Sequence, residues 1–247
     1  MELSLLISLG VFTIAFLIGA TAIGGLLLVP TLVVVGNYTV HQVIPVSLMA
    51  TFFSGVIGSL VFGRKGHVSL RDVAIIALPA GLTALVGTYL LPFIPSKAVE
   101  FLIAIFCIGA FLLSFQAVEI QRPAEIDPRL SRRTLALIGA ATGLGSALSG
   151  TGGPLILIPI LSYIGFGSKR SVGMAQAIQL PIGGFAAFGN MTIGAIDYRL
   201  AVPITVLVIV GSLCGALYAQ RLNVSALRPL ISFTMLGCGI FYLVRLA

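Results

Sequence analysis

The side chains best suited to chemistry in this chain are uncharged hydrogen-bond donors that stand beside glycines inside apolar segments. Two glycine pairs, Gly24-Gly25 and Gly152-Gly153, interrupt long hydrophobic stretches, and Thr151 flanks the second pair. A helix that begins at such a break presents unpaired N–H groups and about +0.5 of an elementary charge beyond its N-terminus. The pattern therefore predicts an anion-binding site at the two breaks. The alternative is that these glycines only allow close packing of helices.

A polar stripe follows each glycine break. Ser47 and Thr51 recur at helical spacing in one apolar segment, and Gln176 and Gln179 stand one turn apart in another. Hydroxyl and amide groups can donate hydrogen bonds to an oxyanion without the burial cost of a charge. We expect these four side chains to line the site, although polar side chains in a membrane span can also bind only to a neighbouring helix.

An ionisable side chain stands at the start of each segment that carries a polar stripe. Arg170 could clamp an oxyanion through two parallel hydrogen bonds, and His41 belongs to the residue type that changes charge near neutral pH. Arg170 can instead be an interface anchor whose charged head reaches water, and His41 can be a hydrogen-bonded helix cap. Both residues enter the predicted substrate site.

Carboxylates take no part in the predicted site. None of the seven Asp and Glu residues lies at the centre of an apolar stretch, whereas Lys and Arg number fourteen and the net charge is +7. An acidic side chain in a membrane is the usual sign of a cation site or proton relay. The substrate is therefore expected to be neutral or anionic. The three cysteines are too far apart for a metal cluster, so we expect no metal. We also expect no cofactor and no nucleic-acid partner.

These residues must be positioned by helices that cross a lipid bilayer. Hydrophobic residues make up 58% of the chain, and several runs reach the roughly 20 residues that span a bilayer. The fold class is an all-α polytopic membrane protein. Its predicted hydrophobic elements are 3–36, 40–62, 72–92, 98–118, 133–165, 170–193, 199–219 and 226–245. A polar linker, 119–133, separates a first transmembrane repeat, 1–118, from a second, 134–247.

The two halves repeat each other. Pro30 and Pro159 correspond at an offset of 129 residues, and Gly66-His-Val-Ser-Leu-Arg71 corresponds to Gly194-Ala-Ile-Asp-Tyr-Arg199 at an offset of 128. The first element of each half is longer than one span needs, so the part beyond each glycine break is expected to turn back as a half-helix. Backbone breaks at membrane depth are tolerated where they line protein or a watery cavity.

The basic residues favour an inverted arrangement of the halves. Loop 63–71 is rich in Lys and Arg whereas its counterpart 193–199 is not, and the bias reverses in the next pair of loops. With the linker inside the cell, inversion puts nine basic residues inside and three outside, and leaves Lys169 and Arg170 unassigned. An arrangement of eight plain spans with both termini inside gives nine against five and remains open.

Taken together, the motifs resemble those of the sulfite exporter TauE/SafE family of bacterial membrane transporters, over nearly the whole chain. They are the segment from Gly24 to Leu32, the segment 43–48, the loop 66–71, and the second copies 152–159 and 194–199. In segment 43–48 the family pattern has a glycine and a threonine before the serine, where this chain has Pro45 and Val46. The second copy lacks the threonine and serine.

The resemblance implies a secondary transporter in the bacterial cell (inner) membrane. It would move sulfite, a sulfonate or a similar small sulfur-containing or organic anion by alternating access, with coupling to protons left open. A passive anion channel is the alternative. An intramembrane hydrolase, suggested by Ser146 and Ser149, needs a base, and His41 and His67 are the only histidines, so we expect no enzyme. The oligomeric state stays open.

Overall fold

The computed structural model describes residues 5–23, 25–66, 70–116, 131–163, 168–221 and 228–246. Gly24, His67 and residues 119–130 of the predicted linker lie outside them. Within this part of the chain every regular element is helical. The helices are α1 (Leu5–Thr21), α2 (Gly25–Val34), α3 (Val40–Gly63), α4 (Leu70–Leu90), the 3-10 helix η1 (Leu91–Phe93), α5 (Ser96–Gln116), α6 (Arg132–Ser149), α7 (Pro154–Tyr163), α8 (Ser168–Thr192), α9 (Tyr198–Ala219) and α10 (Arg228–Leu246).

Local capping signals account for where several helices begin. Thr39 and Gln42 form a capping box at the start of α3, in which the Thr39 hydroxyl accepts from the Gln42 N–H and the Gln42 side chain accepts from the Thr39 N–H. The Ser131 hydroxyl caps α6, and the Asp197 carboxylate caps α9. These side chains satisfy N–H groups that a helix leaves unpaired in its first turn.

The first element of each half is divided into a long helix and a short one, as predicted. α1 ends at Thr21 and the half-helix α2 begins at Gly25, while α6 ends at Ser149 and the half-helix α7 begins at Pro154. The first residues of α2 and α7 are 129 positions apart (154 − 25 = 129), as are the last residues of α3 and α8 (192 − 63 = 129). The sequence repeat is therefore also a repeat of helix boundaries.

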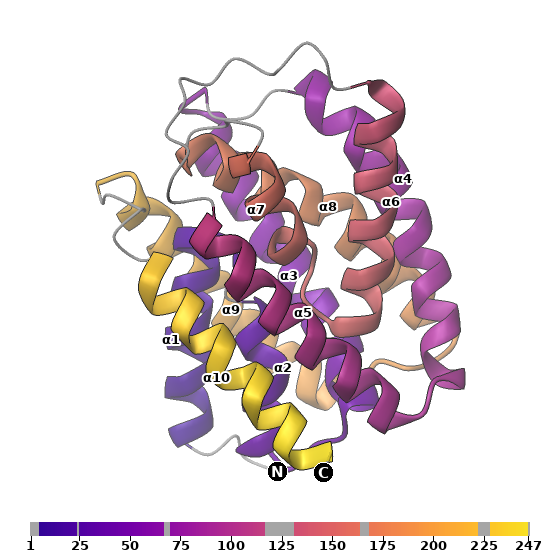
Figure 1. Ribbon diagram of the computed structural model, residues 1–247. Helices are drawn as coiled ribbons and strands as arrows, with labels where there is room; N and C mark the ends of the chain where they lie inside the picture. The colour runs from indigo at the N-terminus through magenta and orange to yellow at the C-terminus, as the bar shows by residue number, and fades with distance from the viewer. Residues whose placement is uncertain are drawn as a thin grey trace.

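Helix packing also repeats between the two halves. α1 packs along α9, and their counterparts α6 and α4 pack along each other at the opposite side of the bundle (Figure 1). α3 packs against α9 and α8 against α4, which are again equivalent pairs. α3 with α8, and α5 with α10, pair each element with its own repeat copy. The α3/α8 pair thus forms the shared centre of the two halves.

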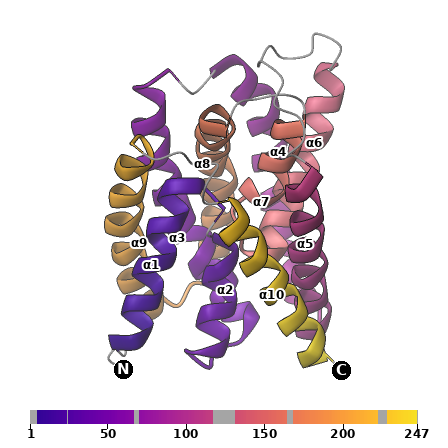
Figure 2. The same cartoon turned by 60° about the vertical axis from the view of Figure 1, so that its left-hand side comes forward.

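The helices run between two ends of the bundle (Figure 2). α3 finishes at the upper end of that view, whereas its counterpart α8 finishes at the lower end, where α1 begins and α10 ends. This is the arrangement that inverted repeats require. The inversion with respect to a membrane stays a prediction, because the sides of the membrane are not defined by the fold.

The exterior of the bundle is apolar. Leu78, Leu82 and Val86 recur along the exposed face of α4, and α9 exposes Val202, Val206, Val210, Leu213 and Leu217 in the same way. In the part of the chain that the structure describes, three helices are long and apolar enough to cross a membrane: Val40–Gly63, Val73–Phe93 and Tyr198–Ala219. An apolar exterior around buried polar side chains suits a multi-pass membrane protein.

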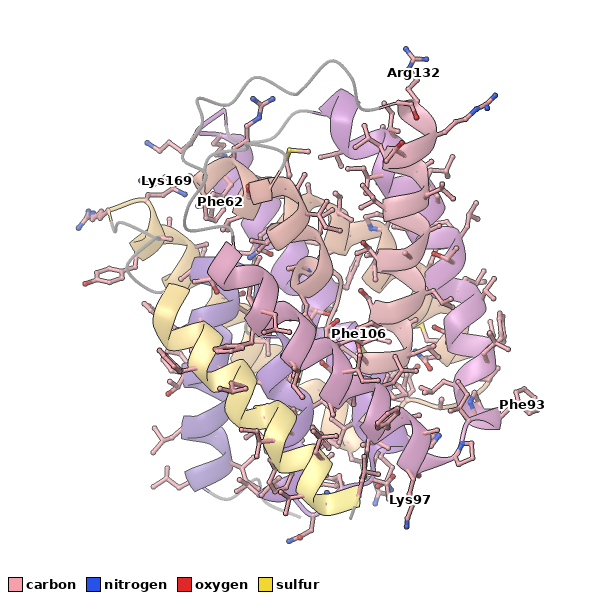
Figure 3. All side chains as sticks on the ribbon, in the orientation of Figure 1. Phe62, Phe93, Lys97, Phe106, Arg132 and Lys169 are labelled. Carbon is pink, nitrogen blue, oxygen red and sulfur yellow. The ribbon has the colours of Figure 1, made fainter. Side chains whose placement is uncertain are left out.

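Basic side chains gather at one end. Arg132 and Lys169 lie at the upper end of the bundle, and Lys97 lies at the lower end (Figure 3). The described basic side chains at the upper helix ends are Arg64, Lys65, Arg132, Arg133, Lys169, Arg170 and Arg221, against Lys97, Arg199 and Arg245 at the lower ends. Lys169, which the sequence left unassigned, joins the basic end, where its ammonium group donates to the Gln220 carbonyl at 3.1 Å.

Candidate functional site

The two glycine breaks meet inside the bundle. A Cβ atom placed on Gly25 would lie 2.8 Å from the carbonyl oxygen of Thr151 and 3.2 Å from the Thr51 methyl group. A Cβ atom on Gly152 would lie 3.0 Å from the Thr51 hydroxyl oxygen. α3 therefore places Thr51 between the first residue of α2 and the break before α7. The fold brings together residues that are more than a hundred positions apart in the sequence.

The backbone of both breaks adopts left-handed conformations. Gly150 ends α6 with φ 72°, and its N–H donates to the carbonyl oxygen of Ser146. Gly152 and Gly153 have φ 74° and 111°. Ala22, in the first break, has φ 64°, which is uncommon for a residue with a side chain. Pro154 then stands at the first position of α7, where its missing N–H costs nothing. These conformations turn the chain sharply enough for each half-helix to start at the centre of the bundle.

One hydroxyl group of α3 bonds directly to the second break. The Ser47 hydroxyl donates to the carbonyl of Gly150 at 2.7 Å, and both residues are buried. Thr51 donates to the Leu48 carbonyl of its own helix at 3.1 Å. Ser47 therefore supports the second break, and Thr51 keeps only its acceptor lone pairs for a ligand.

The two glutamines of α8 hold the other break. The side-chain nitrogen of Gln176 donates to the carbonyl of Ile18 at 2.8 Å, and that of Gln179 donates to the carbonyl of Ala22 at 3.4 Å. Both side chains are fully buried. One N–H of each amide is thus used at the end of α1, so the glutamines connect α8 to the first break in the way that Ser47 connects α3 to the second.

Two further hydroxyls near the second break also donate to backbone. Ser146 donates to Thr142, and Ser149 donates to Gly145 at 2.6 Å and lies 3.0 Å from the Thr151 hydroxyl. Backbone N–H groups in the first turns of α2 and α7 are also candidate donors for a ligand, because a helix leaves them without a partner of its own. Leu26 and Leu157 are exceptions, since their N–H groups donate to the carbonyls of Ile23 and Gly153, and Pro154 has no N–H. Both half-helices direct their positive ends to the same region.

His41 and Arg170 lie at the two ends of the bundle, away from the breaks. The His41 Nε2 atom is 3.0 Å from the Ile94 carbonyl and 3.2 Å from the Leu91 carbonyl, and Nδ1 is 3.1 Å from the Ser96 hydroxyl. Arg170 lies in the first turn of α8, six residues or about 9 Å along the helix before Gln176. Neither residue is grouped with the glycines, although both were predicted for the substrate site.

The residues considered for a hydrolase are not brought together. Ser146 and Ser149 belong to the end of α6, whereas His41 is bound to η1 and the start of α5. Among the described residues, no three His, Cys, Asp or Glu side chains gather as ligands for a metal ion.

Two further polar residues lie near the centre, outside the set predicted to bind the substrate. The hydroxyls of Ser54 in α3 and Thr142 in α6 are buried and have no hydrogen-bond partner among the described residues. Thr142 lies beside the second break, since its methyl group is 3.5 Å from a Cβ atom placed on Gly153. The available signal was helical spacing: Ser54 continues the Ser47 and Thr51 stripe.

Comparison with known proteins agrees with this architecture. The chain is 27% identical to the probable membrane transporter protein YdhB of Bacillus subtilis (strain 168), over 86% of this chain and 87% of that protein. It is 25% identical to the probable membrane transporter protein MJ0441 of Methanocaldococcus jannaschii, over 90% and 88% of the two chains. The probable membrane transporter protein ORF9 of Sinorhizobium sp is 22% identical over 88% and 83%. No solved structure shows significant similarity to the chain.

The family comparison covers both repeats and both breaks. The model of the family described as sulfite exporter TauE/SafE matches residues 6–242. The match begins in α1 and ends in α10, so it includes both half-helices and the α3/α8 centre. This multi-pass membrane protein therefore belongs to the sulfite exporter TauE/SafE family of membrane transporters.

Proposed function

We propose that this protein is a secondary transporter that moves a small anion, such as sulfite or a sulfonate, across the bacterial inner membrane by alternating access. The observation that carries the proposal is the close approach of Gly25, the first residue of α2, to Thr151 in the break before α7, with Thr51 beside both. Two positive helix ends directed at one buried region favour a negative charge there. The substrate class agrees with the description of the matching family as sulfite exporters.

The chemistry of the region supports transport rather than permanent binding. The buried polar side chains around the breaks are hydroxyls and amides, among them Ser47, Thr51, Gln176 and Gln179. Backbone N–H groups stabilise an anion without a fixed countercharge, so release toward either side does not leave a buried cation behind. A transported ligand must bind firmly enough to enter and weakly enough to leave.

The charges at the two ends support one orientation. Basic side chains are concentrated at the end that carries Arg132 and Lys169, and Lys or Arg excess marks the cytoplasmic side of bacterial membrane proteins. We therefore place this end, with the predicted linker 119–133, in the cytoplasm. Loop 193–197 then faces the outside.

The test is uptake of radiolabelled sulfite into proteoliposomes that contain the purified full-length chain. A carrier gives saturable uptake, and unlabelled sulfite on the opposite side accelerates exchange of the label. Flux that rises linearly with sulfite and shows no acceleration would make the protein a passive channel. No flux of sulfite or of simple sulfonates would overturn the proposed substrate class. Imposed pH gradients of both signs then decide whether protons are coupled.

A further inference from the structure

Gln176 and Gln179 each bury an oxygen atom that has no hydrogen-bond partner in the part of the chain that the structure describes. Their side-chain nitrogens face the carbonyl oxygens of Ile18 and Ala22. A carbonyl oxygen can only accept, so the amide atom facing it must be the NH2 group, and the partners fix the orientation of both amides. The Oε1 atoms are consequently left as free acceptors, and neither has a partner among the described residues.

These acceptors lie where α3 crosses α8 beside the first break. A Cβ atom on Gly55 would lie 2.9 Å from the Gln179 Cβ, and one on Gly58 would lie 2.7 Å from Oε1 of Gln176. Glycine at both positions leaves room for the amides in an otherwise close crossing. The amide of Gln179 lies at the break itself, because its nitrogen bonds to Ala22.

A structural role explains the nitrogens but not the oxygens. Holding the end of α1 requires one N–H from each glutamine, and that bond is present. A buried acceptor without a donor costs free energy, so a donor that a ligand brings to this point would be stabilised there. An oxyanion that carries only acceptor oxygens cannot do so, because its oxygens would meet the glutamine oxygens without a proton between them.

We propose that the substrate is an anion that also carries its own O–H or N–H donor. The anionic group binds at the N–H groups of the two half-helices, and the donor binds to Oε1 of Gln179, with Oε1 of Gln176 one helical turn away. Hydrogen sulfite and hydroxy- or amino-substituted sulfonates belong to this class, whereas alkyl sulfonates do not. The inference rests on the proposed function and narrows its substrate.

The experiment compares two sulfonates of equal size. 2-Hydroxyethanesulfonate and 1-propanesulfonate have the same number of heavy atoms, but only the first carries a donor at its far end. Binding to the purified full-length protein is measured by calorimetry and by the ligand-induced rise in melting temperature. One neutral hydrogen bond predicts about tenfold tighter binding of the hydroxy compound. Equal affinities would overturn the inference and leave the anion site standing, whereas no binding of either would overturn both.

A variant pair identifies the acceptor. Gln179→Leu should remove the tenfold preference, so that the two sulfonates bind to this variant with similar affinities. Asn190→Leu is the matched control, because Asn190 is another buried amide of α8 whose oxygen has no described partner, about 17 Å further along the helix. It should retain the preference. If Gln179→Leu weakened both ligands equally, the glutamine would be structural and the inference would fail. The comparison in the unmodified protein stands even if this variant does not fold.

Discussion

The hydroxyl of Ser47 donates a 2.7 Å hydrogen bond to the carbonyl oxygen of Gly150, 103 residues further along the chain. It joins the central helix of the first half to the break of the second. Gly150 is the left-handed residue that ends α6, so this bond fixes the point from which the chain turns toward α7. A contact between the halves thereby sets the geometry at which the second half-helix begins.

Replacing Ser47 by Ala should lower both stability and transport. The Gly150 carbonyl would stay buried without its partner, which costs about 1–3 kcal/mol of unfolding free energy. Thermal unfolding and sulfite flux are the measurements. Ser59→Ala is the control on the same helix, because the Ser59 hydroxyl has no partner among the described residues, and it should change little. Similar losses in both variants would contradict the role of the Ser47 bond.

Adding one methyl group at the meeting point of the breaks should disturb the site directly. Gly25→Ala places a Cβ atom 2.8 Å from the Thr151 carbonyl oxygen, so the two breaks must move apart. We expect a loss of about 1–3 kcal/mol in stability, as in other overpacked interiors, together with loss of the anion-induced rise in melting temperature. Gly109→Ala in α5 has open space around its new Cβ atom and should be neutral or stabilising by up to about 1 kcal/mol. If Gly25→Ala bound the anion as tightly as the unmodified protein, the contact between Gly25 and Thr151 would not belong to the anion site.

Two glycines that hold the outer helix pairs together should behave alike. A Cβ atom on Gly143 would collide with the Ala80 carbonyl of α4, and one on Gly215 would collide with the Phe16 carbonyl of α1. Each Ala variant should lose about 3 kcal/mol of stability, at the upper end of the usual cost of overpacking. Gly237→Ala in α10 meets nothing within 4 Å and is the control. Unequal effects of the first two would show that the α4/α6 and α1/α9 pairs are not mechanically equivalent.

Thiol labelling tests the orientation of the two halves. Gly66 and Gly194 have φ 73° and 67°, so cysteines are better placed at the neighbouring exposed positions Lys65 and Ile193. In a background without Cys107, Cys214 and Cys238, an impermeant reagent added to intact cells should label Ile193→Cys and not Lys65→Cys. Permeabilised cells provide the control in which both react. Equal labelling from outside would rule out the inverted arrangement.

The helical architecture could be predicted because it depends on hydrophobicity and breakers. The turn of each first element into a half-helix followed from Gly25 and from the glycines before Pro154, and the structure begins α2 and α7 at those residues. Lys169 was left unassigned in the charge count of the inverted arrangement. Its position became clear only from the packing of α8 against the rest of the bundle.

Details of hydrogen bonding were beyond the sequence. Spacing brought Gln176 and Gln179 to one face, but it could not show that their nitrogens bind the end of α1 and that their oxygens are the free atoms. Similarly, Gly25 could be expected to admit a ligand, whereas its contact with Thr151 also makes it a packing residue. Such properties depend on distances between segments that lie far apart in the chain.

The equivalence of the α1/α9 and α6/α4 pairs bears on the proposed alternation between an inward-facing and an outward-facing state. If α1 slides along α9, the equivalent displacement in the other half is that of α6 along α4, and it engages the same kinds of contact. Two states related in this way would have equal free energy in a chain with identical halves. Any imbalance then arises from differences between the halves. At the centre these differences include Ser47 aligned with Gln176 and Ala50 aligned with Gln179. Substitutions at these two pairs of aligned positions would change which side of the membrane the site faces when no substrate is bound.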